Sequence, residues 1–238
     1  MVIAMEIGVS EAAERLGVGP SRVRQLLHAG DLEGRRVGRS WLVSAEDVAR
    51  LQGRRRHPGR PLGPLRAWGA LDLLDGGAAP WLSYAARSQV RSHLSRLSDA
   101  DADRWRSMLR GRSRVLRIVA HPAAVPRLLA REDVQPAGAE EAARRGFDLV
   151  AFEGRVDEVY VPDKVWPAAR SALALKEARP DESNNLLVRI PQRVWPFAEH
   201  APVSDAALAA DLLEAAEPRA ISAGERQLSA LLQEWQRR

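Results

Sequence analysis

Residues 9–51 of this chain of 238 residues read VSEAAERLGVGPSRVRQLLHAGDLEGRRVGRSWLVSAEDVARL. Ser10 precedes an acidic turn, which is typical of a helix start, and the small apolar residues up to Leu16 repeat at helical spacing. A glycine-rich turn follows, and Pro20 suits the first position of a second helix that ends near Gly30. Two short helices around such a turn are the arrangement of the helix-turn-helix motif.

The residues after the second helix predict a hairpin. Residues 32–43 read as two short strands around Gly38 and Arg39, and Ser44 followed by Asp47 predicts a cap for a third helix. A hairpin beside a helix-turn-helix forms a wing, which can contact phosphates or the minor groove. We therefore expect a winged helix-turn-helix in residues 1–52.

The second helix divides into an apolar face and a polar face. Val23, Leu26 and Leu27 are expected to point inward, so the polar residues remain available for base edges in the major groove. The candidate DNA-binding residues are Ser21, Arg22, Arg24, Gln25 and His28 in this helix, Arg35, Arg36, Arg39, Ser40 and Trp41 in the hairpin, and Arg54, Arg55, Arg56 and Arg60 beyond it. Arginine pairs best with guanine and glutamine with adenine. A helix-turn-helix used for protein contacts is the alternative.

This stretch resembles the excisionase/MerR-like helix-turn-helix family. The resemblance is carried by the small-residue first helix, the Gly30-Asp31-Leu32 exit, the Val37-Gly38-Arg39 wing and the acid-capped third helix. It implies DNA binding through the second helix and the wing. The Gly19-Pro20 pair in the turn departs from the usual pattern and leaves the start of the reading helix open by a residue or two.

Charge is distributed unevenly along the chain, whose net charge is +5. Residues 1–60 carry 11 arginines against 7 acidic residues, and residues 61–120 carry 10 against 5, whereas residues 121–238 carry 15 basic residues against 19 acidic ones. High-GC codon usage explains arginine in place of lysine but does not explain this segregation. The pattern indicates a first half that meets phosphates and a second half with another role.

Composition excludes several classes of function. The chain has no cysteine, so disulfides, thiolate catalysis and cysteine-ligated metal sites are excluded. No apolar run is long enough to span a bilayer. We expect no signal peptide, because the first residues have no basic region ahead of an apolar core. We expect a cytoplasmic protein without a membrane partner, a cofactor or a bound metal.

Residues 53–61 form a basic linker by composition. Its Gly59-Arg60-Pro61 could insert an extended arginine into a narrow minor groove, contact phosphates, or remain solvated, and the sequence leaves these three roles open.

Residues 62–112 predict a helical segment, with helices over 64–74 and 87–97. The second of these exposes Arg87, Arg91 and Arg96, either as another DNA contact or as a solvated basic face. The aromatic residues expected to pack in the core are Trp68, Trp81, Tyr84 and Trp105.

Residues 113–238 predict a small α+β domain with a mixed sheet, so the fold class of the chain is α+β. Strands are expected over 115–120, 148–152, 157–161 and 186–190, and helices over 123–130, 138–145, 165–178, 204–216 and from a capping box at Ser222 to the end.

Residues 113–238 show no motif of a known catalytic site, and we expect no enzyme activity. His121 and His200 lie in turn contexts, where histidine is usually structural or exposed. The acidic residues Asp157, Glu158, Asp163, Asp205, Asp211 and Glu214 are expected at scattered surface positions, where they form no paired-carboxylate site. An acidic domain joined to a basic one is more typical of a protein-binding role.

A second resemblance covers residues 115–232, which look like the C-terminal domain of AbiEi-type antitoxins of type IV toxin–antitoxin pairs. It rests on Gly138 and Gly146, the Tyr160-Val161-Pro162 strand end, Asn185 before a strand, and the Asp211-Leu212-Leu213 helix. It implies an autorepressor that binds its own promoter and neutralises a nucleotidyltransferase-like toxin. The head departs from the winged helix that this family usually has.

Three functions are compatible with these patterns. The first is an autorepressor that is also an antitoxin. The second is an excisionase-like or architectural DNA-binding protein without a toxin partner. The third is an enzyme acting on nucleic acid, which would need a catalytic site that the sequence does not display. Because one head covers a small area of DNA, we expect repeated sites in the operator, occupied by a homodimer or by monomers.

Overall fold

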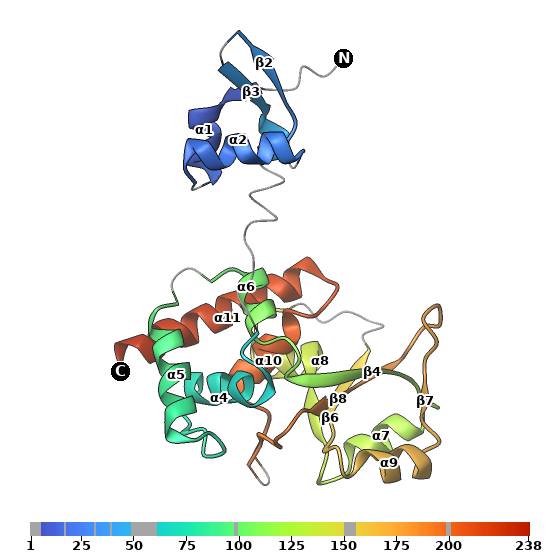
Figure 1. Ribbon diagram of the computed structural model, residues 1–238. Coiled ribbons are helices and arrows are strands. Elements are labelled where there is room, and N and C mark those ends of the chain that lie inside the picture. The colour runs from blue at the N-terminus through green and yellow to red at the C-terminus, as the bar shows by residue number, and fades with distance from the viewer. Residues whose placement is uncertain are drawn as a thin grey trace. The chain divides into compact units, whose positions relative to one another are not determined.

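The computed structural model describes residues 6–16, 18–30, 32–38, 40–48, 61–97, 100–149, 156–198 and 201–238 (Figure 1). The chain divides into two compact units, Met1–His57 and Pro58–Arg238, called here the N-terminal unit and the C-terminal unit. Five of the candidate DNA-binding residues, Arg39, Arg54, Arg55, Arg56 and Arg60, lie outside the described residues, as does His200. None of the helices in the described part of the chain combines the length and apolar content needed to cross a lipid bilayer.

The N-terminal unit has the predicted winged helix-turn-helix architecture. Its elements are β1 (Glu6–Gly8), α1 (Val9–Leu16), α2 (Pro20–Ala29), β2 (Gly34–Val37) and β3 (Ser40–Ser44), and residues 45–48 are helical. The sheet has the order β1-β3-β2 with antiparallel pairs throughout. Strand β1 was not predicted, because three residues are too few to show an alternating pattern.

The ends of α2 follow from single residues. Gly19 is extended before the helix, and Pro20 occupies its first turn. Gly30 adopts the left-handed conformation (φ 77°), and its backbone N–H donates to the carbonyls of Leu26 and Leu27. Val23, Leu26 and Leu27 are buried in the core of the unit, as expected.

The C-terminal unit contains a group of five helices on one side: α4 (Pro64–Leu74), α5 (Tyr84–Ser95), α6 (Ala102–Met108), α10 (Asp205–Leu212) and α11 (Pro218–Arg237) (Figure 1). They share one apolar core, so the helices of residues 62–112 pack directly against the last two helices of the chain. Trp68 and Trp105 are buried in this core. The prediction that Tyr84 packs is wrong, since its side chain is 88% exposed at the first position of α5.

A five-stranded mixed sheet forms the other part of this unit and confirms the α+β class. Its strands are β4 (Ser113–Val119), β5 (Gln135–Ala137), β6 (Asp157–Tyr160), β7 (Lys176–Glu177) and β8 (Leu186–Pro191), in the order β5-β6-β8-β4-β7. Only the β6–β8 pair is parallel. Helices α7 (Ala124–Leu129) and α9 (Trp166–Ala172) bury apolar residues against the sheet, and α8 (Gly138–Arg144) follows β5.

The predicted bounds of several elements differ from the structure; the helix expected over 204–216, for example, ends at Leu212, and the helix expected over 87–97 spans Tyr84–Ser95. The helix expected over 165–178 ends at Ala172, because Ala174 has a φ of 48° and the next residues form strand β7. The last helix begins at Pro218, before the capping box expected at Ser222. Residues 148 and 149 are not in a strand, and the rest of the strand expected there lies outside the described residues.

Candidate nucleic-acid interface

Helix α2 presents a polar face to solvent. Its five candidate residues, Ser21, Arg22, Arg24, Gln25 and His28, are all exposed, while the residues between them are fixed in the core. Because the buried side chains hold the helix on α1, the polar face is rigidly displayed. This is the arrangement required of a recognition helix.

Two of these side chains contact one another. An Nη1 hydrogen of Arg22 is donated to Oε1 of Gln25 at 3.0 Å. By contrast, the guanidinium of Arg24 has no hydrogen-bond or ion-pair partner among the described residues, so it is free to contact a base or a phosphate.

His28 and Trp41 connect α2 to the wing. Nδ1 of His28 lies 2.6 Å from the carbonyl oxygen of Arg24. Since a carbonyl only accepts, Nδ1 carries the hydrogen in this contact. The His28 ring also meets Trp41 of β3 edge to face at a centroid distance of 6.0 Å. Trp41 therefore helps to fix the C-terminal end of α2.

The wing arginines differ in their surroundings. Nε and Nη2 of Arg35 donate to the carboxylate of Glu6 at 2.9 and 2.8 Å, a bidentate pair that crosses β3 to reach β1. The hydrogen bond from Arg35 lowers the pKa of Glu6 below its usual value. Arg36, which is paired with Trp41 in the strand register, is exposed and has no partner in the described part of the chain, and Ser40 is exposed beside it. The sequence did not indicate Glu6 as the partner of a wing arginine.

The basic face expected in the middle segment is partly engaged. Arg87 donates to the carbonyl of Leu82 at 3.2 Å and is half-buried. Arg91 is exposed on α5, and Nε of Arg96 donates to the carbonyl of Ser92.

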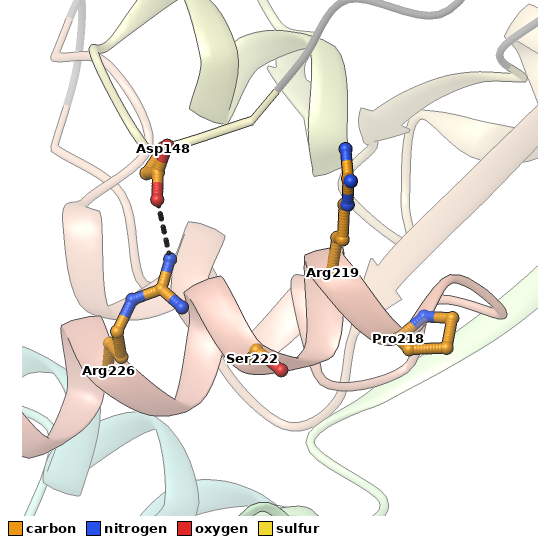
Figure 2. A pocket seen from close by; sticks show the side chains of 5 residues that line it. All are labelled: Asp148, Pro218, Arg219, Ser222 and Arg226. Atoms are coloured by element: carbon orange, nitrogen blue, oxygen red, sulfur yellow. Dashed lines mark hydrogen bonds and ion pairs between the residues drawn. The ribbon is translucent and has the colours of Figure 1, made fainter.

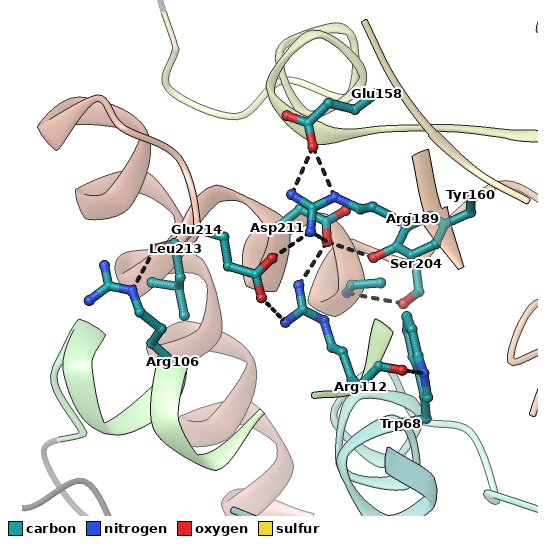
Figure 3. A network of polar contacts seen from close by, with 11 residues as sticks. Trp68, Arg106, Arg112, Glu158, Tyr160, Arg189, Ser204, Asp211, Leu213 and Glu214 are labelled. Atoms are coloured by element: carbon teal, nitrogen blue, oxygen red, sulfur yellow. Dashed lines mark hydrogen bonds and ion pairs between the residues drawn. The ribbon is translucent and has the colours of Figure 1, made fainter. Parts of the chain in front are cut away.

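The C-terminal unit holds a polar network that the sequence did not predict (Figure 3). Arg112 and Arg189 are buried, and both contact Asp211 and Glu214. Arg189 also pairs with Glu158 at 2.8 Å. The expectation that these three acidic residues are scattered is therefore wrong, and Asp211 is buried rather than at the surface.

Asp211 is the centre of this network. Its Oδ1 accepts from Arg112 at 2.8 Å and from the hydroxyl of Tyr160 at 2.6 Å, whereas its Oδ2 is buried without a partner in the structure. Burial raises the pKa of Glu158 despite the charge of Arg189. For Glu214, burial is outweighed by the two arginines, and the pKa is lowered. The network ties α10 and the α10–α11 connection to strands β6 and β8 (Figure 3).

A pocket of about 370 Å³ opens beside the first turns of α11 (Figure 2). It is lined by Asp148, Pro218, Arg219, Ser222 and Arg226. Arg226 pairs with Asp148 at 3.0 Å, and both side chains are largely exposed. Within the described parts of the chain, no three histidine, aspartate or glutamate side chains are grouped so that they could hold a metal ion.

Comparison with known proteins identifies the N-terminal unit. Residues 7–56 match a family of proteins described as "Helix-turn-helix domain", so the chain carries a helix-turn-helix domain that supports binding to double-stranded DNA. A 46-residue stretch is 50% identical to the "Probable plasmid-partitioning protein ParA" of Thermus thermophilus. That match covers 19% of this chain and only 14% of the other protein. No solved structure matches the chain.

Proposed function

We propose that the chain is a transcriptional autorepressor that acts as the antitoxin of a toxin–antitoxin pair. In this proposal the N-terminal unit binds the promoter of its own operon, and the C-terminal unit neutralises a nucleotidyltransferase-like toxin by binding rather than by catalysis. The observation that carries the DNA-binding part is the exposed polar face of α2 on a helix-turn-helix domain.

The chemistry of the N-terminal unit supports duplex DNA as its ligand. Arg24 on α2 and Arg36 on β2 are exposed cations without partners among the described residues. Arginine side chains of this kind bind phosphate oxygens and also read guanine in the major groove. A helix and a hairpin that carry them together form a surface suited to both contacts.

Three observations support a protein partner for residues 121–238 of the C-terminal unit. Residues 121–238 carry more acidic than basic residues, which disfavours a phosphate backbone as their ligand. The same residues resemble the C-terminal domain of AbiEi-type antitoxins. The pocket beside α11 offers hydrogen-bond donors from Arg219, Ser222 and Arg226 to a partner's acidic groups.

Repression and neutralisation call for separate tests. Expression of a reporter driven by the promoter upstream of the gene should be repressed by the full chain. The double substitution R22A/R24A should restore that expression. Co-expression with the product of the adjacent gene should rescue growth if that product is toxic, and the two proteins should co-purify. Repression without rescue would leave a DNA-binding regulator and remove the antitoxin role.

An excisionase-like or architectural DNA-binding protein is the second candidate. The 46-residue similarity to a probable plasmid-partitioning protein favours it, because that protein's printed name places it outside toxin–antitoxin pairs. The similarity covers only 14% of that protein, so it supports no partitioning activity here. This candidate predicts DNA binding by the full chain, with no toxicity of the neighbouring product.

A further inference from the structure

Arg22 and Gln25 form one unit on the reading face of α2. They are three positions apart on the helix, where side chains are neighbours, and the Arg22–Gln25 distance is 3.0 Å. A guanidinium has only donors, so the amide atom facing it must be the oxygen. The contact therefore fixes which end of the Gln25 amide is turned away from Arg22.

This contact changes what Gln25 can offer to a base. Its Oε1 is engaged by Arg22, and its Nε2 amino group is the end left for a ligand. Arg22 keeps the rest of its guanidinium donors. Both side chains are exposed, so the pair presents hydrogen-bond donors to the groove.

The bases differ in how they meet a surface of donors. A free glutamine amide pairs with adenine through one accepted and one donated hydrogen bond, at N6 and N7. Guanine presents two adjacent acceptors, N7 and O6, in the same groove. Oε1 has a second lone pair, but the guanidinium beside it places positive charge where adenine would bring its N6 amino group. Guanine is therefore the base that matches this pair.

We infer that Arg22 is a positioning residue that sets specificity by turning Gln25 from an adenine reader into a guanine reader. The inference rests on the proposed binding of DNA through α2. It goes beyond that proposal because it names the base that Gln25 selects and the residue that determines the choice.

The test is selection of binding sites by the full-length chain from a pool of randomised duplexes. The base pair read by Gln25 is located as the one at which Q25A loses discrimination. At that base pair we expect guanine for the wild type. The substitution R22M frees Oε1 and should move the ratio of adenine to guanine affinity by at least about fivefold toward adenine. The control R127M removes an exposed arginine of α7 and should leave the selected sequence unchanged.

Other outcomes would overturn the inference. The first is selection of adenine by the wild type. The second is a uniform loss of affinity in R22M with an unchanged ratio of adenine to guanine affinity, which is the behaviour of a phosphate contact. The substitution Q25E gives an independent check should R22M fail to fold: a carboxylate beside Arg22 only accepts, so the selected base should change from guanine to cytosine. If no consensus emerges at all, the proposed repressor function fails as well, whereas a consensus without guanine at this position removes only the role of Arg22.

Discussion

Arg24 is the side chain of α2 best placed for direct contact, because it is exposed and no described side chain engages its guanidinium. We expect R24A to weaken binding to the operator by about 1–3 kcal/mol. Fluorescence anisotropy with a promoter duplex measures this, and R127A in the C-terminal unit is the matched control. Equal affinities of R24A and the wild type would remove Arg24 from the reading role.

The buried arginines of the C-terminal unit should matter for stability. Removing Arg189 leaves Glu158, Asp211 and Glu214 short of a charged partner, so R189A is expected to lower the free energy of unfolding by about 3–5 kcal/mol. The exposed pair of Arg226 with Asp148 is the control, and R226A should cost less than about 1 kcal/mol.

Urea unfolding followed by tryptophan fluorescence reports this difference, because six of the seven tryptophans lie in the C-terminal unit. Similar losses of stability in R189A and R226A would mean that the network contributes no more than a surface ion pair.

Asp75 should make stability depend on pH in an unusual direction. Its carboxylate accepts hydrogen bonds from the backbone N–H of Ala206 at 3.1 and 3.2 Å, and burial raises its pKa from 3.8 to about 6. The folded chain thus keeps this proton to a higher pH than the unfolded chain does. The contribution of Asp75 to stability is therefore full below pH 3.8 and is lost as the pH rises to about 6.

The substitution D75N removes this titration. The difference in unfolding free energy between the wild type and D75N should fall as the pH rises from 3.8 to about 6 and stay level above that range. A difference that increases over this range would contradict the raised pKa.

Among the elements, the strands of the wing are joined by an ion pair that we expect to compete with DNA for Arg35. Glu6 on β1 engages Arg35 on β2 at 2.8 Å, and both residues are exposed. We expect E6Q to strengthen DNA binding, since Arg35 becomes available to a phosphate. The slope of the logarithm of affinity against the logarithm of salt concentration should become steeper by roughly one released counterion. Titrations over a series of salt concentrations test this, and an unchanged slope would show that Arg35 does not reach the DNA.

The elements with clear end signals were predictable. Ser10, Pro20, Gly30 and Ser204 each mark a boundary through local chemistry, and the structure places helix ends at or beside these residues. Strands β1, β5 and β7 have two or three residues and carry no periodic pattern of their own. Their formation depends on the neighbouring strands, which the local sequence does not reveal.

At the scale of the whole molecule, the candidate reading face was predictable and the buried network was not. The residues of α2 lie within one helix, so helical spacing alone brings them to one face. The network joins Arg112 to Asp211, about a hundred positions later, and Arg189 to Glu158 on the neighbouring parallel strand. Such partners become visible only when the order of the strands is known.

The proposed function depends above all on binding of duplex DNA by the N-terminal unit through the polar face of α2. The most direct measurement is the affinity of the full chain for a promoter duplex as a function of salt, for the wild type and R22A/R24A. We expect the logarithm of the association constant to fall linearly with the logarithm of salt concentration, and the double substitution to weaken binding and flatten the slope. Binding that is insensitive to salt, or equal for both proteins, would contradict it.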